Sequence, residues 1–159
     1  MIVVEPSDPQ DLPGILRISQ NADVFTEEEV STVDELFQGY LNSPQKSGYY
    51  YLSCRVDGLL AGFACWGPTA LSKATADFYW LCTDRVFQGR GVAQALFKEV
   101  EKRVLEVGLW QIIIWTSGKE NYAPARCLYQ KMGCELVVKI PEFYDHGDDL
   151  CVYLKRLTH

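Results

Sequence analysis

The stretch FYWLCTDRVFQGRGVAQALFKEVEKRVLEV, residues 78–107, determines the fold that we predict for this chain. Its apolar beginning is typical of a strand that ends near Thr83, and a turn with two glycines follows over residues 88–93. From Ala93 to Val107 apolar residues recur at i, i+3, i+4 and i+7, the spacing of one helix face. Strand, glycine turn and helix together direct free backbone N–H groups and the positive end of a helix dipole to one place, which predicts an anion site.

The spacing of the glycines excludes two common phosphate loops. Gly89 and Gly91 lack the third glycine of the dinucleotide fingerprint, because Gln94 stands in its place, and no Lys-Ser or Lys-Thr pair completes a P-loop. The turn instead has the pattern Gln-x-x-Gly-x-Ala, formed by Gln88, Gly91 and Ala93. This pattern resembles the acetyl-CoA pyrophosphate loop of the GNAT family of N-acetyltransferases.

Length and charge limit the remaining possibilities. With 159 residues, 48% of them hydrophobic, we expect one globular domain over residues 1–159. The net charge of −6 argues against a nucleic-acid partner that is held through its phosphates.

Cysteines and terminal residues indicate the compartment. The six cysteines form no Cys-x-x-Cys pair and only two histidines could join them, so we expect no metal site. Most of them lie in apolar runs, as reduced thiols do in cytosolic proteins. The N-terminus does not read as a signal peptide, and no apolar stretch approaches the length of a membrane span, so we expect a soluble, cytoplasmic protein without a membrane partner.

The remaining elements are read from hydrophobic periodicity. Ser7 with Gln10, and Thr26 with Glu29, resemble capping boxes before the first two helices. The run at 109–115 predicts a strand buried on both faces, and 141–149 predicts a polar loop between the last two strands. The predicted strands are 2–4, 49–56, 59–66, 74–83, 109–115, 134–140 and 150–154, and the predicted helices begin near residue 12 and cover 27–41, 93–107 and 121–132.

A second motif supports the family resemblance. Ala125, Leu128, Tyr129 and Gly133 match the pattern Ala-x-x-Leu-Tyr-x-x-x-Gly of a family helix, and this helix follows the expected strand. The two motifs span about residues 75–135. The resemblance implies an α/β (α+β) fold with a mixed, mostly antiparallel central sheet of six to seven strands, flanked by about four helices.

The resemblance also implies how acetyl-CoA binds. Backbone N–H groups of the glycine turn would hold the pyrophosphate, with charge added by Arg90, and the preceding strand would pair with the pantetheine arm. The family often has asparagine seven residues before the motif tyrosine, where this chain has Tyr122, and Asn121 is the neighbouring candidate. The implied cofactor-binding residues are Leu81, Cys82, Thr83, Gln88, Gly89, Arg90, Gly91, Val92, Ala93 and Asn121.

Acetyl transfer to an amine requires two proton transfers. An alkylammonium of pKa about 10.4 is only ~0.04% neutral at pH 7, so a general base helps the attack. The resemblance puts a general-acid tyrosine at Tyr129 and the catalytic carboxylate of some members at Asp77. Asp148 and Asp149 are rival carboxylates.

Features around the acceptor leave alternatives open. Six acidic residues and no basic one lie between Arg17 and Lys46, which indicates either an electronegative wall for a cation or capped, solvated helices. Residues 144–149 could bind an ammonium group or form a simple hairpin turn. Trp66, Tyr79 and Trp80 could line a hydrophobic acceptor pocket, although most aromatic residues at strand spacing belong to the core.

The resemblance implies an acetyl-CoA-dependent N-acetyltransferase that acts directly on a primary amine of a small molecule, peptide or protein. The alternative is a non-catalytic acyl-CoA-binding regulatory module. A homodimer is left open by the sequence.

Overall fold

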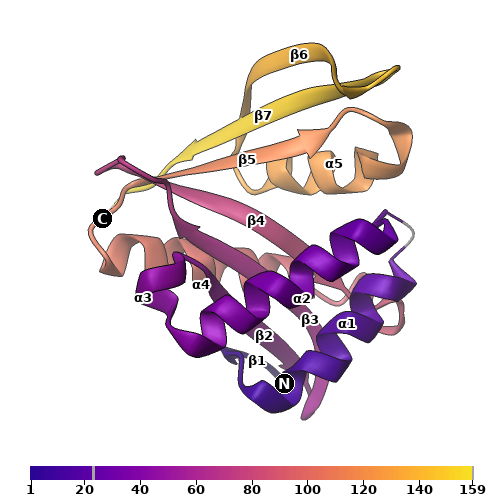
Figure 1. The fold of residues 1–159 in the computed structure, drawn as a ribbon, viewed down its shortest axis with the longest axis vertical. Helices are drawn as coiled ribbons and strands as arrows, with labels where there is room; N and C mark the ends of the chain where they lie inside the picture. Colours follow the sequence, from indigo (N-terminus) through magenta and orange to yellow (C-terminus); the bar gives the residue numbers. More distant parts are fainter. Residues whose placement is uncertain (23, 159) are drawn as a thin grey trace.

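A computed structural model describes residues 1–22 and 24–158. Asp23 and His159, counted above among the acidic residues and the histidines, lie outside the described residues. A seven-stranded sheet with the order β1-β2-β3-β4-β5-β7-β6 runs through the molecule (Figure 1). Its strands are β1 (Ile2–Pro6), β2 (Tyr50–Val56), β3 (Leu59–Pro68), β4 (Thr75–Thr83), β5 (Gln111–Ser117), β6 (Glu135–Asp145) and β7 (Asp148–Arg156).

Helices cover both faces of the sheet, and in Figure 1 α1 and α2 lie in front of it with α4 behind. Buried residues of α1 and α2 pack on β2, β3 and β4, while those of α4 pack on the opposite face. The fold predicted from the two motifs is confirmed. The helices are α1 (Leu12–Asn21), α2 (Glu27–Asn42), the short α3 (Pro44–Ser47), α4 (Val92–Glu106) and α5 (Ala123–Lys131).

The predicted capping box is present before α2 but not before α1. Thr26 and Glu29 form the expected capping box of α2. Before α1, however, the box belongs to Asp8 and Asp11, so the prediction of Ser7 with Gln10 is wrong. Ser7 is buried and its hydroxyl lies 2.6 Å from that of Ser53 on β2.

The parallel pair β4 and β5 separates after three residues. Thr75–Asp77 pair with Gln111–Ile113, and beyond that point β5 pairs only with β7 while β4 pairs only with β3. Figure 1 shows the two strands diverging from this junction. The separation leaves the second half of β4 with a free edge, which faces the site described below.

A β-bulge at Tyr79 changes which way β4 directs its side chains. Trp66 pairs with Phe78, whereas the preceding Cys65 pairs with Trp80, so Tyr79 is the extra residue. Phe78 therefore joins the core under α4, while Trp80 and Cys82 pack with the core under α1 and α2.

Two sequence predictions for the C-terminal strands are wrong. In the predicted run, Ile112 and Ile114 of β5 are buried in the core, whereas Ile113 is half-buried and Trp115 is 56% exposed, because no helix within the described residues covers their face. Residues 141–149 are not a loop, since β6 continues to Asp145 and β7 begins at Asp148. Polar residues are tolerated there because β6 is an exposed edge strand. None of the helices within 1–22 and 24–158 has the length and hydropathy that crossing a bilayer requires.

Candidate active site

A cleft of about 1510 Å³ opens where β4 and β5 separate. Its walls come from the loop between α1 and α2, the free part of β4, the glycine turn, the end of β5, the start of α5 and the β6–β7 hairpin. Each predicted site residue can therefore be placed inside or outside the lining of this cleft.

The glycine turn forms one end of the cleft. Gly89 and Gly91 have φ of 77° and 84°, the left-handed region that favours glycine, and Gly91 is the N-cap of α4. The first turn of α4 carries no acidic side chain, and no side-chain cap satisfies its N–H groups, all of these residues being described. Such a helix start is suited to an anion.

Close packing positions this helix start against the sheet. Gly62 on β3 has no room for a side chain, because a Cβ there would lie 2.7 Å from the carbonyl oxygen of Cys82 and 2.9 Å from Cγ1 of Val92. The absent side chain lets the N-terminus of α4 approach β4 beside the cleft. Sequence reasoning missed Gly62, since nothing local marks it.

The structure brings most of the predicted cofactor-binding residues together. One of the ten does not line the cleft: Arg90 instead lies over the Phe87 ring, with its guanidinium carbon 5.5 Å from the ring centroid. The residues that line the cleft are Leu81, Cys82, Thr83, Gln88, Gly89, Gly91, Val92, Ala93 and Asn121.

Tyr129 lines the same cleft from α5. Its side chain is only 7% exposed and packs on the rings of Phe78 and Tyr153, at centroid distances of 6.4 and 6.0 Å. None of the described residues forms a hydrogen bond with its hydroxyl. Burial raises the pKa of Tyr129 well above its usual range, so the phenol is neutral and able to donate a proton to a strong acceptor.

Asp77 lies outside the lining of the cleft, at the last residue pair between β4 and β5. Its Oδ2 accepts a hydrogen bond of 2.8 Å from Thr69 and one of 3.4 Å from the hydroxyl of Tyr79. Tyr79 does line the cleft. Asp77 therefore reaches the cleft through the Tyr79 phenol.

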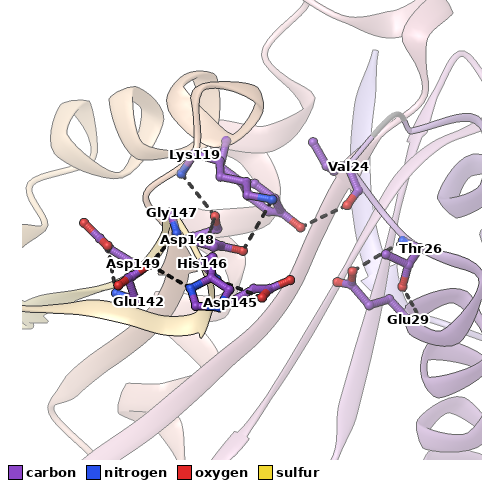
Figure 2. A network of polar contacts seen from close by, with 12 residues as sticks. Val24, Thr26, Glu29, Lys119, Glu142, Asp145, His146, Gly147, Asp148 and Asp149 are labelled. Atoms are coloured by element: carbon purple, nitrogen blue, oxygen red, sulfur yellow. Dashed lines mark hydrogen bonds and ion pairs between the residues drawn. The ribbon is translucent and has the colours of Figure 1, made fainter.

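Tyr122 connects the two sides of the cleft through a hydrogen bond to the carbonyl oxygen of Val24, a residue labelled in Figure 2. Its hydroxyl donates to that oxygen over 3.0 Å and so joins the start of α5 to the loop between α1 and α2. Burial raises the pKa of Tyr122 to about 12, and the nearby carboxylates of Glu29 and Asp148 add to the shift. The sequence identified this position only as a departure from the family asparagine.

Asp148 and Asp149 have different surroundings. Asp148 lines the cleft and accepts a hydrogen bond from the hydroxyl of Ser117, whose oxygen in turn accepts the Lys119 backbone N–H at 3.1 Å. The Lys119 ammonium lies 4.0 Å from Asp148 Oδ2 (Figure 2). Asp149 does not line the cleft, because its carboxylate binds the backbone of Glu142 and lies 3.6 Å from the ammonium of Lys139.

Of the other residues predicted near the acceptor, some line the cleft and others do not. Glu28 and Glu29 are the described members of the acidic segment that line the cleft. Tyr79 and Trp80 line it, whereas Trp66 is 3% exposed and stacks on Tyr50, so of the two alternatives the core holds for Trp66.

Cysteines and metal ligands contribute little to the site. Cys82 is buried, and burial raises the pKa of its thiol to about 12, which makes it a poor nucleophile. Among residues 1–22 and 24–158 no group of histidine, cysteine and carboxylate side chains could hold a metal ion.

Comparisons with known proteins agree with this geometry. The family model "Acetyltransferase (GNAT) family" matches residues 15–134, whereas no curated protein sequence matches the chain. A GNAT-family acetyltransferase structure from Desulfovibrio desulfuricans is 30% identical, with a TM-score of 0.94 over 99% of this chain and 100% of that one.

Two more distant structures contain the cofactor. The yncA acetyltransferase of Salmonella typhimurium, solved with acetyl-CoA, is 15% identical with a TM-score of 0.79 over 99% of this chain and 95% of that one. The PaiA N-acetyltransferase of Thermoplasma acidophilum, solved with coenzyme A, is 18% identical with a TM-score of 0.74 over 98% and 99%. From the family match and the 30% identical structure, we conclude that the chain belongs to the GNAT family of acetyltransferases.

Proposed function

We propose that this protein is an N-acetyltransferase that transfers the acetyl group of acetyl-CoA directly to a primary amine, without a covalent enzyme intermediate. One observation carries the proposal. A single cleft joins the uncapped N-terminus of α4 to Tyr129, a largely buried residue whose hydroxyl forms no hydrogen bond with the described residues. An anion site and a neutral proton donor in one cleft are what a phosphate-bearing thioester requires.

Acetyl-CoA would extend along the free edge of β4. The backbone N–H groups between Gln88 and Ala93 would bind the pyrophosphate at the start of α4. The backbone of residues 81–83 has no strand neighbour on the β5 side and would pair with the pantetheine amides, as an added strand does. Asn121, on the opposite wall, would contact the same arm.

The reaction forms a C–N bond and breaks the C–S bond of the thioester. The neutral amine attacks the carbonyl carbon, the amine nitrogen loses a proton to a base, and the leaving thiolate takes a proton from the Tyr129 phenol. Tyr129 is reprotonated from solvent, so the products are the acetamide and free CoA thiol. Burial raises the pKa of Tyr129 and so keeps the phenol protonated, which leaves its O–H available to hydrogen-bond the sulfur as negative charge develops there.

We assign the base to Asp148, acting directly or through one water. Asp148 lines the cleft, and the hydroxyl of Ser117 fixes the orientation of its carboxylate. Asp77, the position implied by the resemblance, would act only through Tyr79, and we propose that it orients that phenol. The pH profiles of Asp148→Asn and Asp77→Asn separate the two roles.

The end of the cleft opposite the glycine turn favours an amine as the acceptor. Glu28, Glu29, Asp145 and Asp148 all line it, so an ammonium group entering from solvent meets carboxylates from two walls. Lys119 partly offsets them.

The test is CoA and product formation from acetyl-CoA with a panel of amines and peptides, followed by mass spectrometry. Acetylated product from one acceptor class is the expected result. If acetyl-CoA binds and no acceptor in a broad panel is acetylated, the catalytic proposal fails and a regulatory acyl-CoA-binding module replaces it.

The donor site is tested separately with Gly91→Glu, which puts a carboxylate at the proposed pyrophosphate site and should abolish acetyl-CoA binding in calorimetry. Gly58→Glu is the matched control, because Gly58 also has φ of 84° but lies in the β2–β3 turn outside the cleft. Equal affinity in the two variants would remove the glycine turn from the donor site.

A further inference from the structure

Arg126 lies outside the cleft but holds a segment of chain that lines it. It belongs to α5, at a position that the second family motif leaves open. Its Nη1 donates two hydrogen bonds of 2.7 Å, one to the carbonyl oxygen of Ser117 and one to that of Lys119. Ser117 ends β5, and Lys119 precedes the short helical turn before α5. One guanidinium group therefore holds both ends of residues 117–119, which we call the β5–α5 turn.

The β5–α5 turn carries the hydroxyl that contacts Asp148. Ser117 is 7% exposed, and its hydroxyl oxygen accepts the backbone N–H of Lys119 at 3.1 Å. The same hydroxyl donates its proton to Oδ1 of Asp148. A serine hydroxyl has a single proton, so the bond accepted from Lys119 helps to fix the direction in which that proton points. The orientation of the Ser117 hydroxyl therefore depends on the backbone conformation that Arg126 holds.

The two carboxylate oxygens of Asp148 have different surroundings. Oδ1 accepts the Ser117 hydroxyl, whereas Oδ2 lies 4.0 Å from the ammonium of Lys119 (Figure 2). Because Oδ1 is already bonded to a hydroxyl, Oδ2 is the oxygen with more capacity to accept a proton from an amine. The Ser117 bond thus sets which oxygen of Asp148 is available to the acceptor.

The β5–α5 turn is also packed closely on β7. The backbone N–H of Gly118 donates to the carbonyl oxygen of Asp149 at 2.9 Å. A Cβ at Gly118 would lie 3.4 Å from both the Cβ of Asp149 and the Sγ of Cys151. The turn is therefore held by β7 on one side and by Arg126 on the other, directly beside Asp148. A shift of the turn would move Ser117 relative to the carboxylate that it orients.

We propose that Arg126 is a positioning residue for the general base, because it holds the β5–α5 turn in the conformation in which Ser117 orients the carboxylate of Asp148. The inference rests on the proposed function, in which Asp148 accepts the proton of the amine. Arginine is suited to this role, since its guanidinium stays charged and hydrogen bonds from charged groups are stronger than neutral ones. Catalytic groups must be held within about 0.5 Å of their productive geometry, so a contact outside the cleft can affect the reaction.

Arg126→Met tests the role, because it keeps most of the aliphatic stem and removes the N–H donors. We expect kcat to fall about tenfold while the KM of acetyl-CoA stays the same. Arg126→Lys keeps the charge and N–H donors and should recover part of the loss. The matched control is Arg103→Met on α4, since Arg103 also bonds within the protein, to Glu99, but does not line the cleft. Its kcat should not change, and circular dichroism checks that all variants fold.

Two further readouts separate positioning from a general loss of structure. If Arg126 acts only through Asp148, adding Arg126→Met to Asp148→Asn should lower kcat/KM no further than Asp148→Asn alone. A structural defect would instead add its own loss. Amide hydrogen exchange at residues 118 and 119 should be faster in Arg126→Met and unchanged in Arg103→Met.

Three results would overturn the inference. They are a wild-type kcat in Arg126→Met, additive losses in the double variant, and unchanged exchange at residues 118 and 119. Wild-type kcat/KM in Asp148→Asn would remove the base and the positioning role with it. A wild-type protein that acetylates no acceptor would refute the proposed function instead, and the exchange measurement would still decide whether Arg126 holds the turn.

Discussion

Replacing Tyr129 by phenylalanine tests the chemistry and the packing of the site together. The substitution removes one hydroxyl and keeps the ring contacts with Phe78 and Tyr153. Since none of the described residues bonds to that hydroxyl, folding loses no protein hydrogen bond. Stability should therefore be unchanged or raised by about 1 kcal/mol, a change in Tm of roughly 2–4 °C for a chain of this size.

The effect on catalysis should be much larger than the effect on stability. General acid catalysis contributes roughly 10²–10⁴-fold, which equals about 2.7–5.4 kcal/mol of transition-state stabilisation. The leaving group is a thiolate, and an ordinary thiol has a pKa of about 8.5, so the loss in kcat should be near the lower end, about 10². The defect should become smaller above about pH 8.5, because the thiolate then leaves without needing a proton.

The assay is kcat and KM from CoA release between pH 6 and 10, with acetyl-CoA affinity and thermal unfolding measured on the same samples. Tyr153→Phe is the matched control: Tyr153 is buried and adjoins Tyr129 but does not line the cleft, so its kcat should not change. An unchanged kcat in Tyr129→Phe, or an equal loss in both variants, would refute the donor role. A large drop in Tm would show instead that the hydroxyl is structural.

Three further predictions concern the residues around the site. Asp148→Asn should lower kcat/KM and shift its pH profile to higher pH, while Asp77→Asn should change the profile little. If instead Asp77→Asn had the larger effect, Asp77 would be the general base. Tyr122→Phe removes the hydrogen bond to the loop between α1 and α2, which should cost about 0.5–1.5 kcal/mol. The KM of the acceptor should rise, and amide hydrogen exchange at residues 24–26 should become faster. Unchanged exchange would contradict a role for this contact. Gly62→Ala should destabilise by about 1–3 kcal/mol in urea unfolding, because its Cβ meets backbone at 2.7 Å, and wild-type stability would contradict the packing argument.

Features that depend on neighbouring residues were predictable from the sequence. The left-handed glycines, the periodic face of α4 and the Thr26 cap are set within a few residues of chain, so a local pattern is sufficient to predict them. The order of elements and the two motifs were likewise enough for the fold. Nine of the ten cofactor-binding residues that the family resemblance implied line one cleft, and eight of them belong to one continuous segment, residues 81–93.

Features that depend on residues far apart in the chain were decided only by the tertiary structure. Asp148 and Asp149 are adjacent, yet one lines the cleft and the other binds the edge strand, because successive residues of a strand point to opposite faces. Trp66 is buried and Trp115 is exposed because helices cover one sheet region and not the other, although both lie in similar apolar runs. Hydrophobicity determined which residues could be buried, and long-range strand pairing determined which of them are.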